Sequence, residues 1–112
     1  ENVFPEIVEE EVVDPGPDPL APDPERRREA LERFPLDTLR FAGTLTLAEV
    51  IRLVVVAPDG LVYKVPEGGY LGQDHGRVIR INSKTGAVEL EEVVMGNFGR
   101  WELRTVNLNV RQ

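Results

Sequence analysis

Apolar and polar residues alternate along most of the chain after residue 38. The stretch LRFAGTLTL (39–47) has an apolar residue at nearly every second position, which is the period of a half-buried β-strand. The run IRLVVVA (51–57) is almost continuously apolar and favours a central strand, and LVYKV (61–65) alternates again. Similar patterns predict three further strands, at 76–82, 87–94 and 101–110.

Turn signals separate these strands at short intervals. APDG (57–60) contains a proline preset for a turn, and SKTG (83–86) has the composition of a hairpin turn. With several short strands and no helices between them, the pattern predicts an all-β fold, a small antiparallel β-sandwich of about six to eight strands. The glycines expected to form structural turns are Gly60, Gly68, Gly72, Gly76 and Gly86.

The final strand changes its apolar phase. Trp101 and Leu103 occupy odd positions, whereas Val106 and the apolar residues after it occupy even positions. A one-residue slip turns later side chains to the opposite face, so the pattern predicts a bulge near Arg104 and Thr105. Trp101 is expected in the core.

A short helix is predicted over residues 24–34, before the first strand. Asp23 suits the N-cap and Pro24 the first helical position, and Pro35 requires the helix to end by Phe34. Three arginines, 26–28, alternate with glutamates and are expected to form a solvated face. The sandwich domain with this helix is therefore assigned to residues 25–112.

Residues 1–24 have a different composition. They contain six of the nine prolines and eight acidic residues, with no lysine or arginine, which predicts an extended acidic tail. The tail also has apolar residues that a solvated tether does not need. It is therefore either a simple tether or a segment that docks on a partner and becomes ordered there. The candidate docking residues are Phe4, Ile7, Val8 and Val12.

Charge and composition narrow the function. The net charge of −7 arises in the tail, and residues 25–112 carry only +1, which disfavours binding to nucleic acid or to anionic lipid. The chain has no cysteine, so thiol catalysis and thiolate metal sites are excluded. No apolar run is long enough to span a membrane. Because the chain starts at Glu1 without a signal peptide, we expect a processed or truncated piece.

The stretch EGGYLGQDHGRVIRI (67–81) holds four glycines and the single histidine, His75. A phosphate-binding loop needs a helix after the glycines, but a strand pattern follows here. Catalysis by His75 would require Ser83, the only serine, which lies in a separate turn without a nucleophile elbow. A metal site needs more ligands than one histidine. The residues therefore predict no catalytic, metal or cofactor site, and a β-rich binding or structural module.

Several motifs resemble one family. The string PDGLVYKVPEGGYLGQDHGRVIRI (58–81), followed by VELEEVV (88–94) and GRWELR (99–104), resembles the PilP family of type IV pilus assembly. RFPLDTLRFAGTL (33–45) resembles the start of the family's folded domain, and the likeness covers about residues 31–108. The GspC proteins of type II secretion share the domain type, but their motifs match less well.

The resemblance implies a connector and not an enzyme. It implies a β-sandwich in the periplasm, associated with the inner membrane through a lipid anchor that lies outside this chain. It also implies that the tail contacts the PilN–PilO heterodimer and that the β domain contacts the secretin PilQ. A GspC-like connector for another secretin, and a hydrolase built on His75, are the alternatives.

The first predicted strand offers candidate residues for secretin contact. Leu39, Arg40 and Phe41 lie where an exposed sheet edge could receive a partner strand. The alternative for Leu39 and Phe41 is that both are core residues, as large apolar residues usually are.

Overall fold

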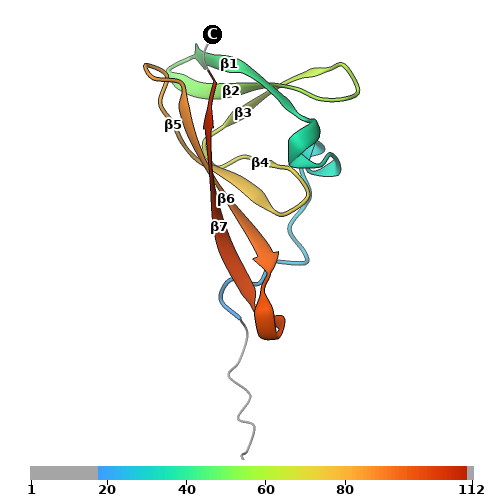
Figure 1. Cartoon of the computed structure of the whole chain (residues 1–112). Helices are drawn as coiled ribbons and strands as arrows, with labels where there is room; N and C mark the ends of the chain where they lie inside the picture. Colours follow the sequence, from blue (N-terminus) through green and yellow to red (C-terminus); the bar gives the residue numbers. More distant parts are fainter. Residues whose placement is uncertain (1–17, 111–112) are drawn as a thin grey trace, which may run out of the picture.

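The computed structural model describes residues 18–110, and this part of the chain folds as two antiparallel sheets without any long helix (Figure 1). The predicted all-β sandwich is confirmed. The predicted docking residues Phe4, Ile7, Val8 and Val12 lie outside the described residues. The strands are β1 Arg40–Leu47, β2 Val50–Val56, β3 Val62–Pro66, β4 Tyr70–Leu71, β5 Gly76–Ile81, β6 Ala87–Met95 and β7 Trp101–Asn109.

The two sheets follow the chain order. One has the order β1-β2-β3 and the other β4-β5-β6-β7, and every pairing is antiparallel. The edge strands are β1 and β3 in the first sheet, and β4 and β7 in the second. Figure 1 shows that the β6–β7 hairpin is longer than its neighbours, and its far end projects beyond the rest of the sandwich. We call this far half of the hairpin the arm.

The core lies between the facing sides of the sheets. Leu53 and Val55 of β2 are fully buried, and they face Val78 of β5 and Leu90 of β6 in one cluster. Both inner faces therefore supply large apolar side chains, and their removal from water stabilises the sandwich. The remaining members of the cluster are Leu31, Leu39, Ala57, Val65, Leu71, Ile81, Val88 and Val110.

The bulge predicted in the last strand is wrong. β7 pairs with β6 in unbroken register from Trp101 to Asn109, and the register shifts occur in β1 and β5 instead. The apolar phase changes because the hairpin uses both of its faces. Val106 and Leu108 face the core near the sandwich, whereas Trp101 and Leu103 lie on the opposite face of the arm. Trp101 is only half-buried and is not a core residue, contrary to expectation.

The helix predicted over 24–34 is also wrong. One turn forms at its start, where the Arg26 N–H donates to the Asp23 carbonyl, and the backbone is extended again by Glu29. Helical structure resumes only in the 3₁₀-helix η1, Ala30–Arg33, which is followed by η2, Leu36–Thr38. An isolated helix of this length is marginal, and the side-chain contacts described below hold the non-helical path instead.

Candidate protein-interaction site

A groove of about 500 Å³ opens between the two sheets, along the side bordered by the edge strands β1 and β7. Its apolar wall comes from η2 and β1, through Leu36, Leu39 and Phe41, and Leu108 of β7 lies across from them. We call this feature the intersheet groove. It forms because β1 and β7 are not hydrogen-bonded to each other, so the sandwich is open along this side.

The three residues predicted for partner contact have different positions. Leu39 is buried and belongs to the core cluster, and Phe41 is half-buried and packs against it. Both nevertheless line the groove, so they are core residues that a ligand in the groove could reach. Arg40 points away from them, as the alternation of a strand requires, and is exposed.

A buried charge closes the other side of the groove. The Glu92 side chain is 3% exposed, and its carboxylate Oε1 accepts hydrogen bonds from Arg104 Nε at 3.1 Å and Nη2 at 2.7 Å. Arg104 also contacts Asp74 Oδ2 at 3.3 Å. The hydrogen bonds and charge of Glu92 raise the pKa of Arg104 above its usual value. The groove therefore combines apolar walls with fixed charges, the mixture typical of protein-binding sites.

Sequence reasoning missed the pair of Glu92 and Arg104. Both residues belong to motifs that signalled the family, but nothing in a strand pattern shows that a glutamate faces inward. The cross-strand register provides the reason, because Glu92 pairs directly with Arg104 on the core-facing side of the hairpin.

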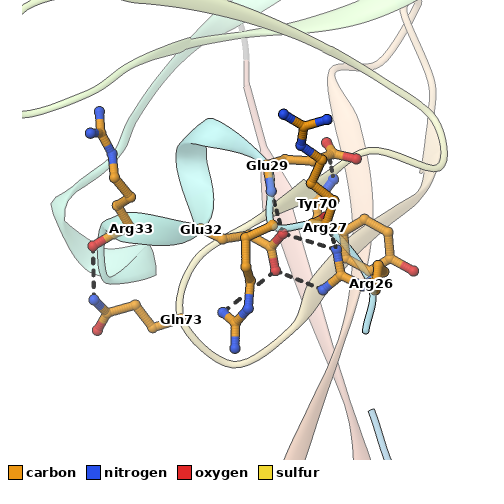
Figure 2. Close-up of polar contacts among 8 residues, drawn as sticks. Arg26, Arg27, Glu29, Glu32, Arg33, Tyr70 and Gln73 are labelled. Carbon is orange, nitrogen blue, oxygen red and sulfur yellow. Dashed lines mark hydrogen bonds and ion pairs between the residues drawn. The ribbon is translucent and has the colours of Figure 1, made fainter. Parts of the chain in front are cut away.

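A second polar cluster fixes the chain before β1 (Figure 2). Glu32 is buried, and its carboxylate accepts two hydrogen bonds from Arg26, at 2.9 and 2.8 Å, and one from the Glu29 N–H. The Arg26 guanidinium lies 3.6 Å from the centre of the Tyr70 ring, a cation–π contact. Arg26 is therefore anchored, whereas Arg27 and Arg28 are exposed, as the predicted solvated arginine face requires.

His75 lies in the turn between β4 and β5, in a left-handed backbone conformation with φ of 57°. Its ring meets Trp101 edge-on, with ring centres 6.1 Å apart. Its Nδ1 atom is buried and has no hydrogen-bond partner among the described residues. Burial, together with the positive charges of Arg28 and Arg26, lowers the pKa of His75. No hydrogen bond connects its side chain to an acid or nucleophile in the described chain, so its geometry provides no triad.

Metal ligands are likewise not clustered in the part of the chain that the structure describes. No group of three or more histidine, cysteine, aspartate or glutamate side chains there has the geometry to hold an ion. The groove itself offers apolar walls, edge strands and fixed charges, which are features that protein interfaces use.

Comparison with known proteins decides the family. The family model described as pilus assembly protein PilP matches residues 5–110, which is nearly the whole chain. The chain belongs to the PilP family. The type IV pilus inner membrane component PilP of Pseudomonas aeruginosa is 31% identical over 93 residues, which is 83% of this chain and 52% of that relative. The chain therefore spans about half the length of this curated relative.

Solved PilP structures share the fold. A domain from the type IV pilus biogenesis lipoprotein PilP of Pseudomonas aeruginosa is 32% identical to this chain, with a TM-score of 0.70. The match covers 80% of this chain and 99% of that domain. A domain of the Neisseria meningitidis PilP pilot protein is 33% identical, with a TM-score of 0.63, over 89% of this chain and 84% of that one. Family membership supports a role in type IV pilus biogenesis.

The glycine stretch of the PilP motif has a geometric explanation. Gly68 and Gly72 have φ near 91° and 79°, values that favour glycine. Gly76 is different, because a Cβ there would lie 2.6 Å from the Leu71 carbonyl oxygen. The four residues between Leu71 and Gly76 thus form a tight turn whose two ends touch. The stretch that suggested a ligand loop is a turn that pairs β4 with β5.

None of the helices in the described chain has the length and apolar content needed to cross a membrane.

Proposed function

We propose that this PilP-family chain is a non-enzymatic connector in type IV pilus assembly. Its β domain binds the N-terminal periplasmic part of the secretin PilQ, and its N-terminal tail binds the PilN–PilO heterodimer. It works on the periplasmic side of the inner membrane. The relatives support the location, since one is named an inner membrane component and another a lipoprotein.

The observation that carries the secretin contact is the intersheet groove. It places Leu36 and Phe41 beside the exposed edge of β1, so a partner strand could pair with the edge while its side chains enter the groove. Asp37 and Gln73 are exposed at its rim, where the charge of Asp37 and the polar amide of Gln73 would affect which partner fits.

The binding test uses the full chain and a purified N-terminal periplasmic segment of the secretin. We expect Asp37→Arg and Gln73→Arg to weaken binding about tenfold or more, because each places a large, positively charged side chain at the groove mouth. Arg27→Glu, on an exposed residue that does not line the groove, is the matched control. Thermal unfolding checks that all variants remain folded.

Unchanged affinity in both rim variants would refute the groove as the secretin site. A type II secretion secretin segment, tested in parallel, addresses the GspC-like alternative. Tighter binding to that segment would assign the chain to the other machine.

The composition of the tail supports the second contact. Its apolar residues stand in an acidic, proline-rich segment, which has too few of them for a core of its own but enough for docking. We expect the triple change of Phe4, Ile7 and Val8 to serine to abolish co-purification with PilN–PilO. The change of Glu9 and Glu10 to glutamine tests whether charge alone mediates binding. If the serine variant still co-purifies, the tail is a tether.

A further inference from the structure

The arm carries an exposed apolar patch that the proposed function does not use. Met95 is 53% exposed, Leu103 is 51% exposed and Phe98 is 98% exposed. Trp101 is half-buried beside them, because it pairs with Met95 across the hairpin. We call these four residues the distal patch. It lies far along the arm from the core, at the end that projects in Figure 1.

Phe98 is the most unusual member of the patch. It sits in the short 3₁₀ turn η3, Asn97–Gly99, with φ of 60°, a left-handed conformation that is uncommon for a large residue. The hairpin thus holds a fully exposed aromatic ring outward in an unfavourable backbone conformation. Contiguous apolar groups of this kind mark contact surfaces.

The chain itself enters the fold at this patch. Asp18, the first described residue, accepts a hydrogen bond from the Trp101 N–H through Oδ2 at 3.0 Å. Two residues later, Leu20 lines a small cavity together with Val93 and Leu103 on the same face of the arm. This face is therefore already partly covered by the N-terminal side of the chain, and the distal patch continues the same apolar strip.

The sequence ahead of Asp18 can reach the rest of the strip. Val13 precedes Asp18 by five residues, a span of at most about 18 Å even when fully extended. Gly16, between Pro15 and Pro17, allows the chain to change direction there. A tether this short gives the two valines, Val12 and Val13, an effective concentration near the patch in the millimolar range.

From these observations we propose that residues 7–13 fold back on the distal patch, with Val12 and Val13 against Phe98 and Leu103. The occupant is this chain's own segment, because its attachment point at Asp18 lies against the patch and only a short stretch of chain joins Val13 to it. The inference does not require either contact of the proposed function, but its segment shares Ile7, Val8 and Val12 with the proposed PilN–PilO contact. Where the tail does bind a partner, that partner must displace the segment from the arm.

Trp101 provides the test, because it is the only tryptophan of the chain and belongs to the patch. In the full chain, we expect the double change of Val12 and Val13 to serine to shift the tryptophan emission to the red and to increase its quenching by acrylamide. Phe98→Ser should cause the same change. Because the valine change and Phe98→Ser remove the same contact, combining them should increase the red shift and the quenching little beyond either change alone. A peptide of residues 1–17 should restore the emission of the valine variant only at about millimolar concentration.

The control is Leu47→Ser, on another exposed large apolar residue, 53% exposed, in the other sheet. It should leave the emission unchanged. The inference is overturned if the valine variant has the emission and quenching of the unmodified chain. It is also overturned if the emission of the unmodified chain depends on protein concentration, since a second copy would then cover the patch.

Discussion

At the scale of single residues, Glu32 and Glu92 are the charged residues buried in the described part of the chain. Each accepts two hydrogen bonds from one arginine, Arg26 or Arg104. Burial alone would disfavour the charged form of a carboxylate, so the paired arginine is what makes burial possible. Neither pairing follows from sequence spacing. Arg26 and Glu32 are six residues apart along an irregular path, and Glu92 and Arg104 meet only through strand register.

The Glu32 cluster predicts a pH dependence. Burial raises the pKa of Glu32, but the hydrogen bonds from Arg26 and the Glu29 N–H outweigh it, so the pKa lies below the usual value. The ionised group therefore stabilises the fold above the pKa of the unfolded chain, and this contribution is lost as the pH falls through the folded pKa. We expect Glu32→Gln to lower the free energy of unfolding by about 1–3 kcal/mol at pH 7.

Urea unfolding at pH 7 and pH 3 measures this effect. The difference between Glu32→Gln and the unmodified chain should shrink at the lower pH, because the stabilisation by ionised Glu32 is lost progressively as the pH falls below the pKa of the unfolded chain toward the lowered folded pKa. Glu25→Gln, on an exposed residue, is the control and should have little effect at either pH. A difference that persists undiminished at pH 3 would contradict the assigned ion pair.

At the scale of elements, the sequence predicted the strands better than the connections between them. The hairpin between β1 and β2 turns through Ala48 and Glu49, both with positive φ, although neither is a residue type that signals such a turn. In β5, simple alternation would place Val78 and Arg80 on one face. The register shift between them instead buries Val78 and Ile81. Such shifts are set by the fit between two sheets, which no single strand encodes.

The turn between β4 and β5 gives an element-scale prediction. Gly76→Ala would place its Cβ 2.6 Å from the Leu71 carbonyl oxygen, a backbone atom that can move only with the turn. We expect it to lower the free energy of unfolding by about 1–3 kcal/mol. Gly60→Asn is the control, because Gly60 has open space around it and asparagine tolerates its positive φ. Equal thermal midpoints for both variants would mean that the contact at Gly76 relaxes without cost.

At the scale of the whole molecule, the residues just after the leading segment are part of the fold. Asp18 and Leu20 contact the arm, so residues ahead of the predicted boundary at residue 25 are part of the described fold. The tail and domain predicted from composition therefore overlap in the structure. Composition cannot detect this overlap, because a proline-rich segment that packs on the fold has the same composition as a solvated tether. We call the packed segment, residues 18–22, the strap.

Two truncations distinguish the contribution of the strap to stability from that of residues 1–17. Removal of residues 1–17 deletes only the proposed contact of residues 7–13 with the distal patch, so we expect it to lower the thermal midpoint less than the longer truncation does. Removal of residues 1–22 should lower it by a few degrees, because the Asp18 hydrogen bond and the contacts of Leu20 are lost. Thermal unfolding followed by circular dichroism measures both. Identical midpoints would show that the strap contributes nothing to stability.

The sequence by itself determined the all-β class, the approximate strands and the family. These depend on local signals, namely the alternation of apolar residues in each strand and the positions of the glycines in each turn. Each signal can be read without knowing what the strand or turn contacts. Only the tertiary structure decided which glutamates are buried, where the bulges lie, that Trp101 lies on the arm, and that β1 and β7 border a groove. Those features arise where residues distant in sequence meet, so their energies depend on partners that a linear pattern does not specify.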